Sequence, residues 1–120
     1  MPLPLKTLAF CAAVLGWAPA QAQFLGFGFE SNIELTKADL DIIHSTVDAE
    51  VHGKAVGATA SWNNPASKNY GSIKLLKKYT LNGHPCETVE YTLATKRVPV
   101  RPEHYMLNSC RQPDGQWRII

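Results

Sequence analysis

Apolar residues between positions 36 and 53 recur at helical spacing. Intervals of three and four residues place them on one face of a helix; they are Leu40, Ile43, Val47 and Val51. Thr36 and Asp39 have the spacing of a capping box, in which each side chain accepts a hydrogen bond from the other residue's backbone. Gly53 is typical of the position after a helix. The pattern predicts one amphipathic helix from Lys37 to His52.

After this helix, apolar and polar residues alternate in five short segments, as in strands with one buried face. The segments are VGATASW (56–62), SIKLLKKYT (72–80), CETVEYTLA (86–94), HYMLNSC (104–110) and QWRII (116–120). In the first segment we expect Val56, Ala58, Ala60 and Trp62 to share one face. Pro65 and Gly71 break the pattern, so residues 63–71 are expected to form a loop.

Turn residues indicate the register of an antiparallel sheet. LNG (81–83) and PDG (113–115) each fit a three-residue hairpin loop with Gly in the left-handed region. The apolar odd-numbered side chains then share one face: Ile73, Leu75, Tyr79, Val89, Tyr91, Leu93, Tyr105, Leu107, Trp117 and Ile119. Two-residue loops would put the apolar sets on opposite faces, because a shift of one residue reverses every side chain.

The same register places Cys86 opposite Cys110, on the other, polar face. That face is expected to carry Lys74, Lys78, Thr88, Glu90, Thr92, His104, Asn108 and Arg118. A helix on the apolar face completes a two-layer arrangement. We therefore predict an α+β fold, with one N-terminal amphipathic helix on a four- to five-stranded antiparallel meander sheet, stapled by one disulfide.

Residues 1–22 have the features of a secretory signal peptide. Lys6 is followed by an apolar run at 8–17 that is too short to span a bilayer, and Ala20-Gln21-Ala22 fits a cleavage site. An uncleaved membrane-anchored helix is the alternative. Cys11 is not expected to be lipidated, because Phe10 stands where a lipoprotein signal has a small residue. We expect export by a Sec-type signal to the periplasm, outer membrane or cell surface.

The rest of the chain divides into an arm at 23–35 and one domain at 36–120. The arm contains QFLGFGFE, whose Phe and Gly residues either dock on the domain, insert into a membrane surface or stay disordered. Cys86 and Cys110 are the two cysteines after the signal peptide. In an exported chain such a pair predicts a structural disulfide, and the spacing is not that of a redox-active C-x-x-C pair.

Charge is unevenly distributed after the signal peptide. Residues 23–50 hold six acids and one Lys, whereas residues 51–120 hold ten Lys or Arg and four acids. This predicts an acidic helix and a basic sheet. The candidate basic face comprises Lys74, Lys78 and Arg118. Contact with anionic envelope lipids or with an envelope protein fits this charge, whereas nucleic acid is not an expected partner of an exported protein.

The residues around the loop at 63–71 are a candidate binding site. An aromatic surface beside amide groups suits a sugar, and the set is Trp62, Asn63, Asn64, Asn69 and Tyr70. The alternative is a structural corner, in which Asn and Pro satisfy local backbone groups and Trp62 fills the edge of the core. We favour the corner.

Catalytic chemistry finds little support in the sequence. The four His residues lie on the predicted helix or on separate strands and do not converge as metal ligands; they are His44, His52, His84 and His104. The disulfide removes the thiol that a Cys/His nucleophile needs. The acids of the sheet region are scattered: Glu87, Glu90, Glu103 and Asp114. We predict no enzyme activity, no metal, no cofactor and no small-molecule substrate.

Three motifs, SWNNPASKNYGSI, NGHPC and CRQPDGQWRII, resemble the C-terminal domain of the bacterial seventeen-kilodalton surface antigen family. The resemblance covers about residues 56–120. The matching positions are Trp62, Asn64, Pro65, Asn69, Gly71, Ser72, Gly83, Cys86, Cys110, Arg111, Asp114, Gly115 and Trp117. The chain departs from the family pattern at Lys68, where Gly is usual, and at Glu87, where Arg is usual. It also lacks a lipidation cysteine of the expected kind and has a reduced Gly-rich segment, two departures that bear on membrane anchoring.

The resemblance implies an outer-membrane or surface-exposed component without enzymatic activity. We therefore predict a non-enzymatic structural or interaction module of the cell envelope, which docks through the basic face or the Phe-rich arm. The alternative is a secreted periplasmic binding protein or inhibitor that recognises a glycan or a glycan-cleaving hydrolase.

Overall fold

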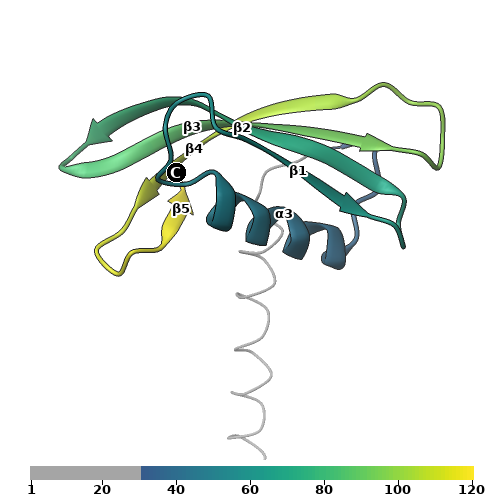
Figure 1. The fold of residues 1–120 in the computed structure, drawn as a ribbon, viewed down its shortest axis with the longest axis horizontal. Coiled ribbons are helices and arrows are strands. Elements are labelled where there is room, and N and C mark those ends of the chain that lie inside the picture. The colour runs from purple at the N-terminus through teal and green to yellow at the C-terminus, as the bar shows by residue number, and fades with distance from the viewer. Residues whose placement is uncertain (1–30) are drawn as a thin grey trace, which may run out of the picture.

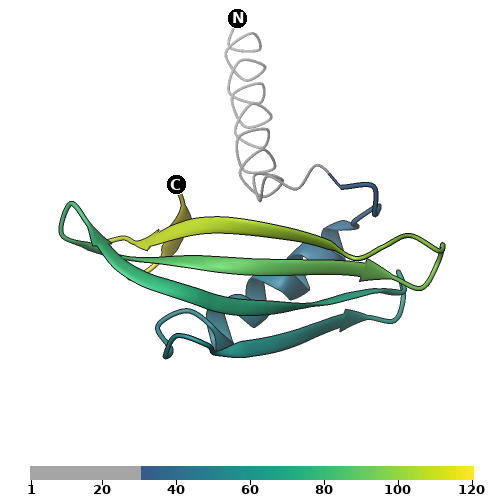
Figure 2. The ribbon, with the colours of Figure 1, turned by 90° about the horizontal axis from the view of Figure 1, so that it is seen from above.

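Residues 31–120, which the computed structural model describes, form two layers (Figure 1). One layer is the helix α3 (Lys37–Glu50). The other is an antiparallel sheet of β1 (Thr59–Asn64), β2 (Asn69–Leu81), β3 (His84–Thr95), β4 (Glu103–Arg111) and β5 (Trp117–Ile119). The strands lie side by side in chain order, as a meander (Figure 2). The predicted signal peptide and most of the predicted arm lie outside the described residues.

Helix α3 begins with the predicted capping box. The backbone N–H of Asp39 donates to the Thr36 hydroxyl, and the backbone N–H of Thr36 donates to the Asp39 carboxylate. The helix ends at Glu50, two residues before the predicted end. The backbone N–H groups of both Val51 and His52 donate to the carbonyl of Val47, which closes the last turn.

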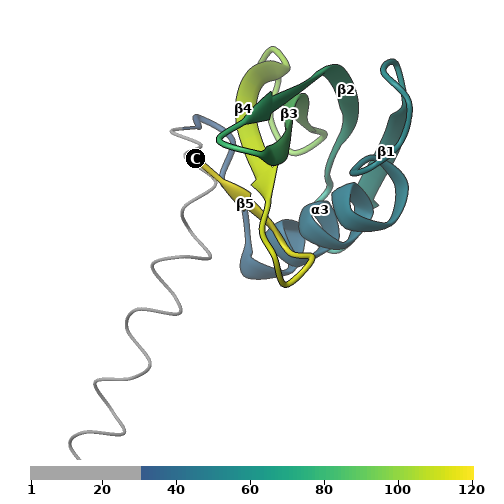
Figure 3. The ribbon, with the colours of Figure 1, turned by 90° about the vertical axis from the view of Figure 1, so that its left-hand side faces the viewer.

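The core lies between α3 and the sheet face turned toward it, which we call the inner face. The apolar stripe of α3 packs there against side chains that are 0–1% exposed; they are Ile73, Leu75, Val89, Tyr91 and Leu93. Each such side chain contributes about 1.5–3 kcal/mol relative to an exposed one. No described segment covers the opposite, outer face of the sheet (Figure 3).

Most of the predicted register is confirmed. Ile73 lies opposite Tyr91, Val89 lies opposite Leu107, and Cys86 lies opposite Cys110. The loop at 113–115 has the predicted three-residue form. The Gly115 N–H donates to the carbonyl of Gln112, and Gly115 has a φ of 87°.

The predicted three-residue loop at 81–83 is wrong. Leu81 pairs with His84, so the loop is the two-residue turn Asn82-Gly83, and both residues have positive φ. This Asn-Gly turn matches the twist of the flanking strands. A bulge at Leu76, between Leu75 and Lys77, takes up the extra residue and keeps the apolar side chains of the rest of β2 on the inner face.

The bulge reverses the faces of the residues between it and the turn, and two of these had been assigned to a face from the sequence. Tyr79 lies opposite Cys86, on the outer face, and not in the core set where it was predicted. Lys78 lies opposite Glu87, on the inner face, and its Nζ donates to the carbonyl of Lys54 at 2.9 Å. Lys78 is therefore not part of the predicted basic face.

The first strand and the loop after it also differ from the prediction. β1 begins at Thr59, and Val56 is 58% exposed instead of sharing the buried face. β1 continues through Asn64 and β2 begins at Asn69, so only residues 65–68 connect them. Lys68 has a φ of 64°, a left-handed conformation that Gly adopts more readily. The Gly that the sequence resemblance leads us to expect at this position would adopt the conformation without strain.

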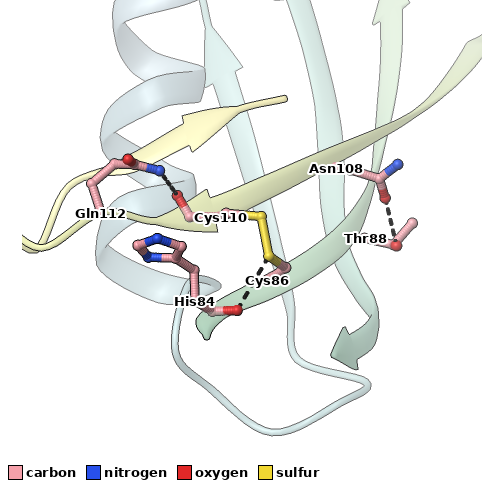
Figure 4. Close-up of a disulfide and its surroundings, with 6 residues drawn as sticks. All are labelled: His84, Cys86, Thr88, Asn108, Cys110 and Gln112. Carbon is pink, nitrogen blue, oxygen red and sulfur yellow. Dashed lines mark hydrogen bonds between the residues drawn. A yellow bond between two sulfur atoms is a disulfide. The ribbon is translucent and has the colours of Figure 1, made fainter. Parts of the chain in front are cut away.

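The predicted disulfide joins Cys86 in β3 to Cys110 in β4 (Figure 4). Both residues are buried, at 1% and 4% exposure. The Thr88 hydroxyl donates to the amide oxygen of Asn108 at 2.7 Å, two residues further along the same strand pair. The bridge therefore ties the two strands together near the end at which β5 joins the sheet.

Removing the disulfide is expected to destabilise the domain. Cys86→Ser should lower the free energy of unfolding by about 2–4 kcal/mol. The variant lacks the cross-link, which joins residues 24 positions apart and restricts the unfolded chain. Urea unfolding under oxidising conditions measures the loss, and reduction of the unaltered protein should lower its midpoint similarly. An unchanged midpoint in both experiments would refute a stabilising role.

Candidate functional site

Two residues of the predicted loop site, Asn64 and Asn69, bind a buried carboxylate. Asp39 is 0% exposed. Its Oδ1 accepts hydrogen bonds from the Asn64 amide at 2.7 Å and the Ser67 hydroxyl at 2.6 Å. Its Oδ2 accepts from the Asn69 amide at 2.7 Å and the Thr36 backbone at 2.8 Å. The carboxylate therefore joins the start of α3 to the turn between β1 and β2.

These hydrogen bonds determine the ionisation of Asp39. Burial alone would raise the pKa of its carboxyl group. The donors, of which the Ser67 hydroxyl acts most strongly, outweigh burial and lower the pKa below its usual value. Asp39 is consequently held as an anion, and its oxygens are engaged by groups of the protein itself.

The five residues of the predicted sugar site do not form one surface. Trp62, Asn64 and Asn69 are 3%, 7% and 0% exposed and belong to the inner face. Asn63 and Tyr70 lie opposite each other on the outer face, where Lys96 Nζ lies 5.5 Å from the centre of the Tyr70 ring. The burial of Trp62, Asn64 and Asn69 supports the structural corner, and it leaves Asn63 and Tyr70 as the exposed members of the predicted set.

A second buried polar contact lies where α3 ends. Glu87 is 0% exposed; its Oε1 lies 2.7 Å from His52 Nδ1, and its Oε2 accepts from the Gly53 N–H at 2.8 Å. The His52 ring stacks on Trp117, with centroids 4.7 Å apart. Sequence reasoning missed this contact. One indication of it was present in the sequence: Glu87 is odd-numbered, and the predicted register directed odd-numbered side chains toward the helix.

The sheet extends beyond the end of α3, and a pocket of about 390 Å³ lies there. Its inner-face lining includes Lys78, Glu87, Arg111 and Trp117, with Gly53 at the helix end. Lys78 and Arg111 are exposed cations of this lining. The Glu87 carboxylate already binds His52 and the Gly53 N–H. Within residues 31–120, no cluster of three or more His, Cys, Asp or Glu side chains is suited to hold a metal ion.

The outer face carries most of the candidate basic residues. Lys74 lies opposite Glu90, and Lys77, brought to this face by the bulge, lies opposite Thr88 with its Nζ 5.4 Å from the centre of the Tyr79 ring. Arg118 lies opposite Cys110, on the same face. Its guanidinium lies 3.5 Å from the Asp114 carboxylate, and both side chains are more than half exposed, so this pair contributes little.

The opposite side of the molecule is acidic. The exposed acids of α3 are Asp41, Asp48 and Glu50. Lys37 is the one Lys or Arg of this helix, and it bonds to Asp41 at 3.3 Å. The predicted separation between an acidic helix and a basic sheet face is therefore present in the fold. None of the helices in the described part of the chain has the length and apolar character of a membrane span.

These features define a class of protein: a small, disulfide-braced α+β domain with a basic sheet face that no described segment covers. Comparison with known proteins gives its family. The chain is 31% identical over 87 residues to the 17 kDa surface antigen of Rickettsia bellii, covering 72% of this chain and 53% of that protein. It is 37% identical over 65 residues to that of Rickettsia conorii, which covers 53% of this chain and 39% of the relative.

A third relative, the 17 kDa surface antigen of Rickettsia prowazekii, is 30% identical over 83 residues, or 68% of this chain and 50% of the relative. The chain thus belongs to the 17 kDa surface antigen family, as the sequence motifs predicted. It spans about half the length of the curated relatives it matches, or less. No family model and no solved structure matches it. The relatives are named as surface antigens and not as enzymes.

Proposed function

We propose that this chain is a non-enzymatic interaction module of the bacterial cell envelope, exported by the N-terminal signal and located in the periplasm or at the outer membrane. Its outer face docks on anionic lipid headgroups of the envelope. The observation that carries this proposal is the separation of charge between the two layers. The names of the relatives support a role at the cell surface.

The charge separation orients the domain on a negative surface. Lys74, Lys77 and Arg118 share the outer face with a single strand carboxylate, Glu90. Each cation near an anionic membrane contributes about 1 kcal/mol. The acids of α3 lie on the other side of the sheet and are repelled, so the docked orientation has the sheet toward the lipid. Met106, which is 67% exposed on this face, adds an apolar contact.

The bulge in β2 supplies a matched pair of variants to test this docking. Lys77 and Lys78 are adjacent and exposed, but they lie on opposite faces of the sheet. Lys74→Gln with Lys77→Gln should weaken binding to phosphatidylglycerol vesicles about 30-fold, because two cations of about 1 kcal/mol each are lost. Flotation with vesicles measures the binding, which should also weaken as salt is added.

Lys78→Gln is the control and should bind as the unaltered protein does. Vesicles of phosphatidylcholine alone, which carry no net charge, should not retain the protein. Equal loss in the double variant and in Lys78→Gln, or equal binding to the two kinds of vesicle, would exclude the outer face as the docking surface.

A further inference from the structure

The sheet has an open edge on β4. β5 pairs only with Ser109, Cys110 and Arg111, so among the described residues no strand lies beside Glu103–Leu107 on that side. We call these five residues the open edge. Such an edge presents unpaired backbone groups that can accept another strand.

The hydrogen-bond pattern of β4 shows which residues direct their backbone groups toward the open edge. The Ile120 N–H donates to the carbonyl of Asn108 at 2.9 Å, on the side of β4 away from β3. In an antiparallel ladder, alternate residues direct their N–H and C=O to the same side. The N–H and C=O of His104 and Met106 therefore line the open edge.

The inner side of this edge is incompletely covered. Tyr105 and Leu107 pack against the core but are only half-buried, whereas the core side chains of β3 beside them are buried. A strand added here would bring side chains onto both residues. Apolar side chains at alternate positions would fit this flank.

The first described residues of the chain lie at the same place. The Ser31 hydroxyl and the Asn32 backbone N–H both donate to the Glu103 carboxylate, the latter at 3.1 Å. Figure 2 shows residues 31–36, in blue, on the side of β4 away from β3. Ser31, the first described residue, therefore lies beside the first residue of the open edge.

We propose that residues 27–30 pair antiparallel with the open edge of β4 and form a sixth strand of this domain. With Ser31 beside Glu103, an antiparallel run places Phe29 beside Tyr105 and Phe27 beside Leu107. LGFGF (25–29) alternates apolar residues with Gly, so both Phe side chains cover the inner flank. Residues 27–31 match the five residues Glu103–Leu107, so the segment's N-terminal end would meet the C-terminal end of β5 beside Asn108.

This pairing engages the arm within its own domain. Gly28 exchanges two backbone hydrogen bonds with Met106, and Glu30 does so with His104. Phe27 and Phe29 are then buried against Tyr105 and Leu107 instead of entering a membrane. The inference is independent of lipid docking, which uses the outer face of the sheet.

Amide hydrogen exchange, measured by NMR on the purified protein with its arm intact, tests the pairing. The amides of His104 and Met106 should be protected. Gly28→Pro removes the N–H that bonds to Met106, so exchange of the Met106 amide should accelerate at least tenfold. Phe29→Ser, which keeps the backbone, should accelerate it less. Gly26→Pro is the matched control, because residue 26 would face Asn108, whose carbonyl Ile120 already occupies.

Unchanged exchange of the Leu93 amide shows that each variant is folded. Protection of His104 and Met106 that withstands Gly28→Pro would overturn the proposal, as would rapid exchange in the unaltered protein. Protection that rises with protein concentration would assign the edge to a second copy of the chain. Protection that appears only with phosphatidylglycerol vesicles would assign it to lipid, and either result also overturns the proposal.

Discussion

Asp39→Ala is expected to lower the free energy of unfolding by about 3–5 kcal/mol. The substitution removes the acceptor of three buried side-chain donors, on Asn64, Ser67 and Asn69. Each buried donor left without a partner costs about 1–3 kcal/mol. It also removes half of the capping box of α3. Because small domains have about 5–15 kcal/mol of stability, this single carboxylate accounts for a large share.

Urea unfolding measures the loss, and Asp41→Ala is the matched control. Asp41 lies in the same helical turn, but its ion pair with Lys37 is 51% and 81% exposed, so its loss should cost less than about 0.5 kcal/mol. Because the folded state lowers the pKa of Asp39, its contribution is fully present above the unfolded pKa of about 3.9. It is lost as the pH falls through the folded value. The difference between the unaltered protein and Asp39→Ala should therefore shrink below about pH 4. Equal losses in the two variants would contradict the role of the network.

The elements that local chemistry determines were predictable from the sequence. Thr36 and Asp39 indicated the start of α3, and the apolar stripe indicated its buried face. Pro113 and Gly115 indicated the last hairpin loop. The turn residues and the alternation of apolar residues indicated the register of β3 and β4, and this register placed Cys86 opposite Cys110.

The bulge in β2 was not predictable in the same way. LNG is compatible with loops of two or three residues, and both bring the core residues together if a bulge compensates for the shorter loop. Leu76, the bulged residue, is apolar like its neighbour Leu75 and leaves no mark in the pattern. The consequence was local: Lys78 and Tyr79 exchanged faces, while Ile73 and Leu75 kept theirs.

The polar contacts depended on tertiary structure. Asp39 was identified as a capping residue, but its bonds to Asn64 and Asn69 join residues 25 and 30 positions apart. Glu87 and His52, 35 positions apart, meet only because α3 ends over β3. By contrast, predicting the charge separation required only that one segment be assigned to a helix and the following segments to strands. The candidate docking face was therefore more predictable than the buried polar contacts.

Gly71→Ala is expected to cost about 3 kcal/mol or more of stability. Gly71 lies in β2 between Trp62 of β1 and Leu93 of β3. A Cβ at this position would lie 1.8 Å from the carbonyl oxygen of Thr92 and 2.7 Å from Nε1 of Trp62. The first of these atoms is backbone in the middle of the sheet and cannot move without displacing β3. Overpacking a core usually costs about 1–3 kcal/mol, and this contact is with a rigid strand.

Gly115→Ala separates this steric effect from backbone strain. Gly115 has a φ of 87°, and nothing lies within 4 Å of an added Cβ, so its replacement should cost about 1 kcal/mol. Chemical unfolding compares the two variants. The indole N–H resonance of Trp62 should shift in Gly71→Ala and not in Gly115→Ala, because only the former crowds Nε1. Equal costs with an unshifted Trp62 resonance would mean that β2 and β3 separate readily at this point, and that the glycine is not needed for their close approach.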